Sequence, residues 1–278
     1  MMVGQDTLDQ LQMEHLVKMN GTTGEIRRLR QESELQTGGM KRFEPLLLFP
    51  LLFLHGVLYN EIGEISAARG VDFGPLMEQG LDAAVPFLSA FVIPYMFAWG
   101  FPVFLIGYLM LATKTPAASF RPVFAALVVL LVTCYTLWIT FPVYVGLRLD
   151  ETFLAEGGWL DQLVLFNYQN SSYWNACPSF HVAGPWFLYR TAKLLYSRLP
   201  RVFLWIALAI IVSTVLIRIH YLMDIVGGLL VSELAVRLVF INLRKHHTLE
   251  NLSSKTVYIY SLSVIAVGFA GYAYLARV

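Results

Sequence analysis

The chain contains 278 residues, of which 57% are hydrophobic and 14% are charged, and its formal net charge is +1. This apolar composition excludes an ordinary soluble domain. The net charge indicates no class of partner, because in an apolar chain the distribution of charge matters more than its sum, and no nucleic-acid partner is expected. The two cysteines, Cys134 and Cys177, lack the spacing of metal ligands and are not expected to form a disulfide. We expect neither a metal ion nor a cofactor.

Residues 1–42 are the only polar stretch long enough to lie outside a membrane domain. They lack the apolar segment of a cleavable signal peptide. Apolar side chains spaced through residues 8–19 predict a short amphipathic helix, which ends at Gly21. We interpret residues 1–42 as a cytosolic extension and residues 43–278 as one transmembrane domain.

Apolar runs of membrane-spanning length recur through the rest of the chain. They predict an all-α fold, a polytopic integral membrane bundle of about six to seven transmembrane helices. Prolines within the second run indicate kinks, which neighbouring helices tolerate in lipid. The seven candidate spans cover residues 43–59, 84–112, 122–146, 179–197, 201–220, 222–242 and 256–276.

The connections between these spans alternate in charge. Those after the second, fourth and sixth spans are basic, whereas those after the first and third are mostly acidic. Because cytosolic loops carry the excess of Lys and Arg, the N-terminus is predicted to be cytosolic. The same alternation brings Arg148, His181 and His220 to the extracytoplasmic face, which is the periplasm or exterior in a bacterium and the lumen in a eukaryote.

Two histidine-bearing span ends carry the candidate chemistry. If the stretch around it is helical, His220 lies four residues before Asp224 on one face, where the carboxylate can orient the imidazole. An oriented imidazole is a competent nucleophile toward phosphorus, and His181 can protonate the departing alkoxide. The first-turn N–H groups beside Ser179 can cradle an anion. These groups favour metal-independent phosphoryl transfer on a lipid substrate at the membrane surface.

Several other polar residues lie in or near the spans, and two of them, both arginines, have two interpretations each. Arg148 and Arg218 are candidate phosphate-binding residues, because a guanidinium donates forked hydrogen bonds to phosphate oxygens. The alternative for Arg148 is to cap or snorkel at the interface, and the alternative for Arg218, two residues from His220, is to point elsewhere. We interpret His55 in the first span as a polar packing contact, and Glu233 with Arg237 as a structural ion pair at i, i+4.

Three stretches, in order, carry a family resemblance. They read FPVYVGLR at residues 141–148, PSFH at 178–181 and HYLMDIVGG at 220–228. The last two resemble motifs of the type 2 phosphatidic acid phosphatase superfamily. More narrowly, the set is similar to the branch of inositol phosphorylceramide synthases, in which an aromatic-Pro stretch with an Arg precedes PS-x-H and H-Y-x-x-D. The resemblance covers about residues 120–242.

The resemblance implies a role for each matched residue. His220 is the expected nucleophile, which forms a phospho-histidine, and Asp224 orients it. His181 is the expected general acid and, in the second step, the general base. Ser179 and the nearby backbone are expected to hold the phosphoryl oxygens. Phosphatase members carry an Arg where this chain has Thr214, a departure that the synthase branch shares.

A further match to the superfamily is rejected. Lys114 and Arg121-Pro122 fit its first motif, K-x6-R-P. The apolar run at 122–146 is about 37 Å long as a helix at ~1.5 Å per residue, which separates these residues from both histidines. We interpret Lys114 and Arg121 as charges that set the topology.

The expected function is head-group transfer between lipid phosphoesters and an alcohol acceptor. One alternative is hydrolysis of a lipid phosphate or diphosphate by the same machinery. The alternative from another class is a non-catalytic membrane transporter or lipid-binding scaffold. The expected partners are a phospholipid or other lipid phosphate and the membrane, and the oligomeric state is left open.

Overall fold

The computed structural model describes residues 44–78, 80–100, 103, 105, 107, 116–195 and 200–245. The predicted extension at 1–42 and the predicted span at 256–276 lie outside these residues. Throughout the described part of the chain the backbone forms helices and loops, and its only β-type pairing is an isolated bridge between Val143 and Asn175. The predicted all-α class is therefore confirmed.

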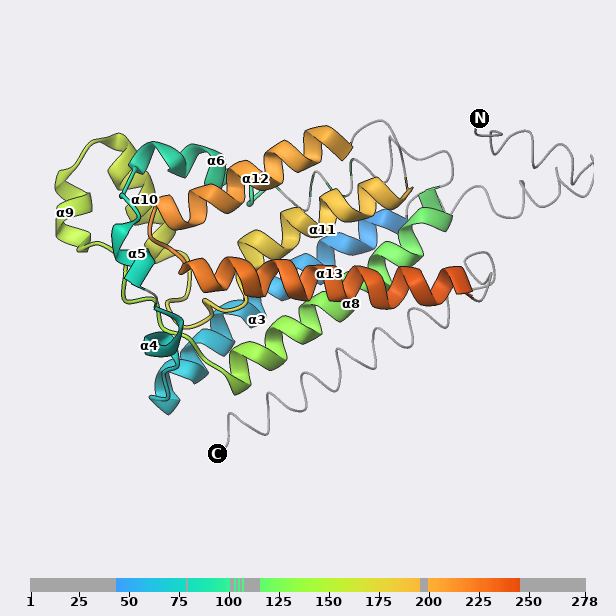
Figure 1. The fold of residues 1–278 in the computed structure, drawn as a ribbon, viewed down its shortest axis with the longest axis horizontal. Coiled ribbons are helices and arrows are strands. Elements are labelled where there is room, and N and C mark those ends of the chain that lie inside the picture. The colour runs from blue at the N-terminus through green and yellow to red at the C-terminus, as the bar shows by residue number, and fades with distance from the viewer. Residues whose placement is uncertain are drawn as a thin grey trace, which may run out of the picture. The chain divides into compact units, whose positions relative to one another are not determined.

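Five long helices form a bundle in which α11 is central (Figure 1). Helix α11 packs against α12, α13 and α8, and α3 packs along α8. Side chains from α3, α8, α11 and α13 make the largest apolar core cluster. The five helices are α3 (Leu48–Arg69), α8 (Pro116–Thr140), α11 (Phe180–Leu195), α12 (Pro200–Leu216) and α13 (Leu222–Lys245).

Short elements gather at the end of the bundle where α8 ends and α11 begins (Figure 1). A second apolar cluster, which includes Tyr95, Tyr168 and Ile217, joins α6 and α10 to the end of α12. These elements therefore cover the part of the bundle where the predicted site residues lie. These short elements are α4 (Gly74–Met77), α5 (Gly80–Ala84), η2 (Ser89–Phe91), α6 (Val92–Met96), α9 (Glu151–Glu156) and α10 (Trp159–Gln169). One further short helix, η1 (Glu44–Leu47), directly precedes α3.

The first predicted span is longer than the sequence suggested. Helix α3 continues past residue 59, the predicted end of the span, to Arg69 through a more polar stretch. It ends where Gly70 adopts a left-handed backbone (φ 63°) and donates its N–H to the carbonyl of Ala67. The predicted boundary was wrong because polarity alone does not stop a helix, whereas a left-handed glycine does.

The second and third predicted spans also have different limits. Between residues 84 and 100 the described backbone is broken into an extended segment, η2 and α6 rather than one helix. Helix α8 ends at Thr140, not at residue 146. The residue before a proline is disfavoured in helical conformation, so Phe141-Pro142 turns the chain into the extended segment that holds Val143.

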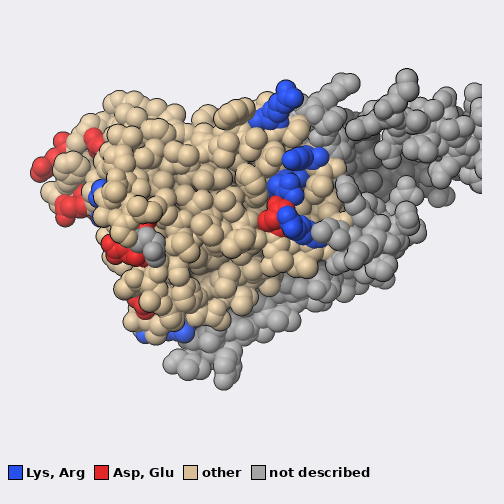
Figure 2. Space-filling view, in the orientation of Figure 1, with Lys and Arg blue, Asp and Glu red and all other residues tan. Residues whose placement is uncertain are grey.

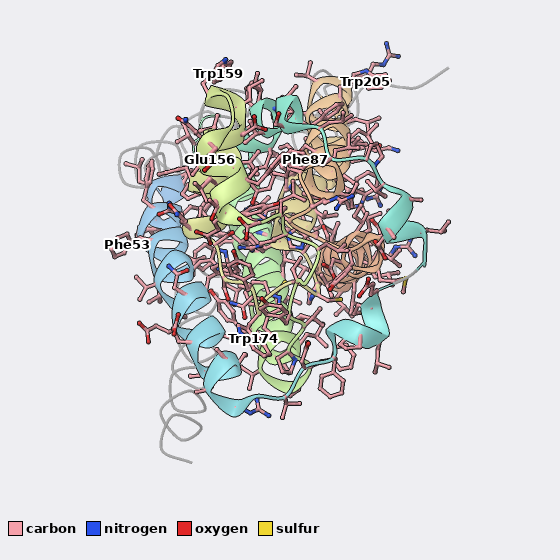
Figure 3. The ribbon with its side chains drawn as sticks, turned by 90° about the vertical axis from the view of Figure 1, so that its left-hand side faces the viewer. Phe53, Phe87, Glu156, Trp159, Trp174 and Trp205 are labelled. Atoms are coloured by element: carbon pink, nitrogen blue, oxygen red, sulfur yellow. The ribbon has the colours of Figure 1, made fainter. Side chains whose placement is uncertain are left out.

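Two features of the long helices fit a membrane. The segments Pro45–Arg69 and Phe120–Thr140 are long and apolar enough to cross one. Large apolar side chains project outward from α3, α12 and α13: Phe53, Trp205 and Leu230 are 76%, 70% and 64% exposed. Figure 3 shows Phe53 and Trp205 at the periphery of the bundle. Exposed apolar surface on this scale is expected where lipid replaces water.

Charged side chains are segregated along the bundle. Figure 2 shows the acidic residues gathered mainly at the end where α9 and α10 lie, and most basic residues at the opposite end. At the basic end, Glu233 pairs with Arg190 and Arg237 at 2.7 and 2.8 Å, as predicted for Glu233 and Arg237. The described residues thus separate charge as the predicted topology requires, and the orientation in the membrane stays a prediction.

Candidate active site

Asp224 is fixed by its position at the start of α13. It is the third residue of that helix, and its Oδ2 accepts a hydrogen bond from the backbone N–H of Tyr221 at 2.9 Å. In a capping box, the side chain of the third helical residue accepts a hydrogen bond from the N–H of the residue before the helix. This contact gives the N–H of Tyr221 a partner that the helix backbone does not supply. The first N–H of the helix, on Leu222, donates to the buried carboxylate of Asp82 at 2.8 Å. Both carboxylates also lie favourably at the positive end of the helix dipole.

His220 reaches Asp224 from a non-helical connection. Helix α12 ends at Leu216 and α13 begins at Leu222, so the condition that this stretch is helical is not met at His220. The side chains meet nonetheless, with His220 Nδ1 3.2 Å from Asp224 Oδ2. A carboxylate accepts only, so Nδ1 carries the proton and Nε2 presents its lone pair.

The open nitrogen of His220 faces His181. His220 Nε2 lies 3.5 Å from His181 Nδ1, and the other nitrogen of His181 lies 2.9 Å from the hydroxyl of Tyr95. Asp224, His220, His181 and Tyr95 thus form one continuous line of polar contacts. His181 stands in the first turn of α11 and Tyr95 in α6, so three separate elements assemble the line.

Ser179 lies beside this line. Its backbone N–H donates to the carbonyl oxygen of Asp224 at 3.2 Å, which ties the two histidine-bearing motifs together. Its Oγ is fully buried and has no hydrogen-bond partner among the described residues. A buried hydroxyl without a partner is uncommon, and here it leaves a donor free for a phosphoryl oxygen.

Two glycines allow α13 to approach the PSFH stretch. A Cβ placed on Gly228 would lie 2.7 Å from the carbonyl oxygen of Ser179 and 2.9 Å from Cβ of Val182. A Cβ on Gly227 would lie 3.0 Å from Sγ of Cys177. Gly228 is one turn beyond Asp224 on the same helix face. The close approach therefore sets the spacing between the helix that holds Asp224 and the helix that holds His181.

The two arginines lie at the same end of the bundle but bind other groups. The guanidinium of Arg148 donates to the carbonyls of Tyr168, Ser171 and Ser172 at 2.9–3.2 Å, and its Cζ lies 3.7 Å from the ring centroid of Tyr173. These contacts favour its alternative interpretation as a residue that holds the loop after α10.

Arg218 has a left-handed backbone (φ 54°) in the connection between α12 and α13, and its Nη2 donates to the carbonyl of Val85 at 3.3 Å. Among the described residues, neither guanidinium donates a hydrogen bond to the histidines or to Ser179. Their predicted contact with phosphate stays a prediction.

Three residues near the site were not singled out from the sequence. Tyr95 binds His181, Asp82 caps α13, and the indole N–H of Trp138 donates to the carbonyl of Pro178 at 3.1 Å. None belongs to a short motif, because each partner is distant in the chain. The usable signal was chemical: Tyr95 is a polar side chain in an otherwise apolar stretch.

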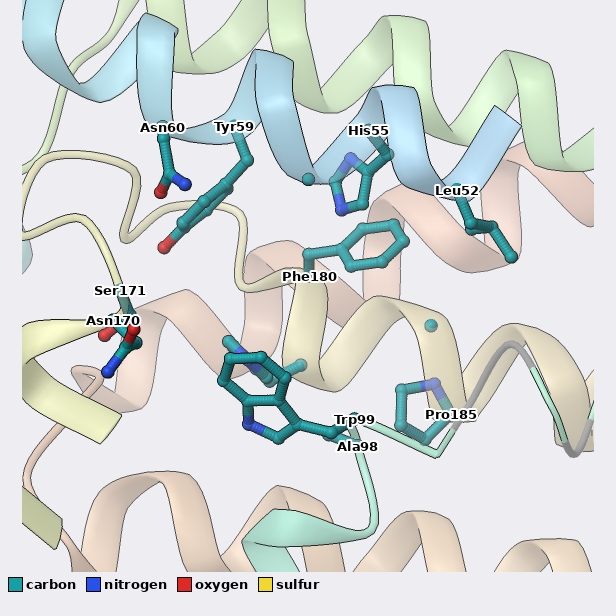
Figure 4. Close-up of a pocket in the computed structure, with 13 residues that line it drawn as sticks. Leu52, His55, Tyr59, Asn60, Ala98, Trp99, Asn170, Ser171, Phe180 and Pro185 are labelled. Carbon is teal, nitrogen blue, oxygen red and sulfur yellow. The ribbon is translucent and has the colours of Figure 1, made fainter. Parts of the chain in front are cut away.

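An apolar pocket of about 240 Å³ opens beside His181 (Figure 4). Residues of α3 form one side, and Trp99 lies on the other. The polar groups Asn60, Asn170 and Ser171 lie at one end of the lining. The remaining lining is mainly apolar or aromatic and includes Leu52, Gly56, Ala98, Phe180, Gly184 and Pro185.

A larger, polar pocket of about 620 Å³ adjoins it. The two pockets share Asn60, Asn170 and Ser171. The lining of this polar pocket combines carboxylates, amides, hydroxyls and aromatic rings: Glu64, Glu151, Gln169, Ser172, Tyr144, Tyr168, Tyr173 and Trp174, besides the three shared residues. It offers hydrogen-bonding groups to a water-soluble or head-group moiety, whereas the first pocket suits a hydrocarbon chain.

The free cysteine closest to the site is not a nucleophile. Burial and the neighbouring Asp224 carboxylate raise the pKa of Cys177 to about 12, so the thiol stays protonated at neutral pH. Among the described residues, no group of three or more His, Cys, Asp or Glu side chains has the arrangement of a metal site.

One comparison with known proteins identifies a family for this chain. The model of the PAP2 superfamily matches residues 60–238, which include all six predicted site residues. Comparisons with curated proteins and with solved structures find no match. The family comprises membrane enzymes of the phosphatase and phosphotransferase type that act on lipid phosphates. The matched length, which is well over half of the chain, shows that this membrane protein belongs to the PAP2 superfamily.

Proposed function

We propose that this protein transfers a phosphoryl-containing head group between lipid phosphoesters through a phospho-histidine on His220. The observation that carries the proposal is the unbroken line from Asp224 through His220 to His181, with contacts of 3.2 and 3.5 Å. Asp224 fixes the His220 tautomer whose Nε2 is nucleophilic, and a second imidazole lies where a leaving group needs a proton.

The first step forms a bond between His220 Nε2 and phosphorus and breaks the bond from phosphorus to the lipid oxygen. His181 gives its proton to that oxygen, and a neutral alcohol leaves. The free hydroxyl of Ser179 supplies a hydrogen bond to the charge on the phosphoryl oxygens. The positive charges of Arg148 and Arg218 at the same end of the bundle favour the anion.

In the second step His181, now neutral, takes the proton of an acceptor hydroxyl. The acceptor oxygen bonds to phosphorus, the bond to Nε2 breaks, and His220 returns to its starting state. An alcohol acceptor completes a transfer, and water completes a hydrolysis. The line of residues is the same for both outcomes, so the acceptor is chosen by the pockets.

The polar pocket favours transfer over hydrolysis. Its volume of about 620 Å³ far exceeds what a water molecule requires, and it adjoins the apolar pocket beside His181. An acceptor with several hydroxyl or amide groups finds partners in Asn60, Gln169 and Asn170. Hydrolysis of a lipid phosphate is the second candidate. It is favoured if the polar pocket only admits water.

The test measures both products with purified protein in mixed micelles that contain EDTA. Donor phospholipids, lipid phosphates and a panel of alcohols are supplied, and free phosphate and new phospholipids are followed together. We expect a new phospholipid from wild type, and none from His220→Ala. Thr136→Ala, on an exposed face of α8, is the matched control and should keep wild-type activity.

The outcomes separate the candidates. Free phosphate without a new phospholipid supports hydrolysis, and turnover that survives His220→Ala contradicts the phospho-histidine. Quenched reactions of wild type should contain a phosphoprotein that is labile in acid and stable in base. Absence of turnover on every lipid supports the non-catalytic alternative.

A further inference from the structure

His55 lies in the apolar pocket but has no part in the proposed phosphoryl chemistry. It projects from α3, where Leu52, Gly56, Tyr59 and Asn60 line the same pocket. Figure 4 shows its imidazole directed from α3 toward Phe180, and the two ring centroids are 4.2 Å apart. The packing role expected from the sequence is present, but it uses only part of the ring.

The hydrogen bond of His55 defines which nitrogen is free. His55 Nδ1 lies 3.0 Å from the hydroxyl of Tyr135, and among the described residues that hydroxyl has no other hydrogen-bond partner. We assign the phenol as the donor to Nδ1, because the Tyr135 hydroxyl has no other acceptor there. A neutral imidazole carries one N–H, so this assignment leaves the ring proton on Nε2. Nε2 has no partner among the described residues, so the apolar pocket contains a hydrogen-bond donor.

The donor lies at a defined distance along the pocket, which can be measured on the axis of α3. Along α3, Asn60 stands at the polar end and Leu52 at the apolar end, which are about 12 Å apart at ~1.5 Å per residue. His55 lies about 7.5 Å from Asn60 along the same helix axis, in the direction of Leu52. Phe180, the neighbour of His181 in the chain, packs on His55 with ring centroids 4.2 Å apart. A lipid with its phosphorus beside His181 and its chain along α3 therefore brings its backbone next to His55.

We propose that His55 Nε2–H donates a hydrogen bond to the carbonyl oxygen that joins an acyl chain to the lipid backbone. His55 is then a specificity-determining residue for acylated lipids, in which the carbonyl is either an ester or an amide. The inference rests on the proposed function, because it assumes a phospholipid at the histidine pair.

A hydrogen-bond donor in an apolar pocket lining distinguishes an acyl carbonyl oxygen from an ether oxygen. An N–H that stays without a partner in apolar surroundings costs free energy, and a carbonyl oxygen removes that cost. An ether oxygen in the same place is a poorer acceptor. By contrast, a His55 that only packs against Phe180 and Tyr135 gives no reason for the enzyme to distinguish the two linkages.

The experiment compares dioleoyl phosphatidate with its dialkyl ether analogue, which has no carbonyl. Apparent kcat/KM is measured for each lipid in mixed micelles with the full-length protein. We expect wild type to prefer the ester lipid by about fivefold, the ratio that one neutral hydrogen bond gives. His55→Phe, which keeps the ring stacking, should bring the ratio close to one, mainly through KM.

Two further variants test the donor itself. His55→Gln retains an N–H group and should keep part of the ester preference. Tyr135→Phe frees the tautomer and should lower the preference. The matched control is Leu52→Met on the same pocket wall, which changes shape but no donor and should leave the ratio at the wild-type value.

The failure of this inference is distinguishable from failure of the proposed function. Equal ester-to-ether ratios in wild type and His55→Phe overturn the role of His55 while leaving the chemistry of His220 intact. Absence of turnover on both lipids and on ceramide 1-phosphate by wild type overturns the proposed function and the inference together. Turnover of ceramide 1-phosphate that depends on His55 identifies the amide as the carbonyl source.

Discussion

The glycine at position 228 offers the sharpest test of how the site is assembled. In Gly228→Ala the new Cβ starts 2.7 Å from the carbonyl oxygen of Ser179, against 3.4 Å for an ordinary contact. Helix α13 and the start of α11 must therefore separate by roughly 0.7 Å. Overpacking of this kind costs about 1–3 kcal/mol of stability.

The same displacement moves Asp224 and His220 relative to His181. A misplacement of about 1 Å between reacting groups can cost a hundredfold in rate, so we expect kcat to fall about 10- to 100-fold. The fall in kcat should exceed what the loss of folded protein explains.

The assay pairs lipid turnover with thermal unfolding in the same detergent. Gly80→Ala is the matched control, because Gly80 is exposed and a Cβ there meets no atom within 4 Å. It should change neither quantity appreciably. Wild-type turnover and stability in Gly228→Ala would refute the idea that this close approach sets the geometry of the two histidines.

Three other predictions follow from single contacts. Tyr95→Phe removes the partner of His181 Nε2 and should lower kcat about five- to tenfold with little change in KM, measured by steady-state lipid turnover. An unchanged kcat contradicts a role for Tyr95 in holding His181. Gly56→Leu directs a side chain into the apolar pocket and should raise KM for long-chain lipids without lowering the melting temperature, because leucine favours a helix by about 1 kcal/mol over glycine. The pKa of Cys177, raised to about 12, keeps the thiol protonated at pH 8, so mass spectrometry should find it alkylated by iodoacetamide only after denaturation; rapid labelling of the folded protein argues against the buried contact with Asp224.

The sequence predicted the contact between His220 and Asp224 better than it predicted the helix limits. The spacing of His220 and Asp224 indicated that their side chains meet, and they do. The reason differed, because the pair bridges an irregular connection and a helix start instead of lying on one helix face. A four-residue spacing is compatible with both arrangements. Only the capping contact between Asp224 and Tyr221 distinguishes them.

The contacts that the sequence could not predict join distant parts of the chain. Tyr95 and His181 are 86 residues apart, and Asp82 and Leu222 are 140 apart. Periodicity and local motifs report on neighbours along the chain, so they carry no information about such pairs. Within α3 the error had another cause, because a run of polar helix formers reads like a loop until a left-handed glycine marks its end.

The proposed transfer also specifies which histidine must move. His220 Nε2 and His181 Nδ1 are 3.5 Å apart, a direct contact that leaves no room for phosphorus and its leaving oxygen between them. His220 is 5% exposed and is held by Asp224, which is itself fixed at the start of α13. His181 is held at its far nitrogen by Tyr95 and borders the apolar pocket. Within the proposed mechanism we therefore expect the substrate to displace His181 into the apolar pocket, with loss of its 2.9 Å contact to Tyr95, while His220 stays in place.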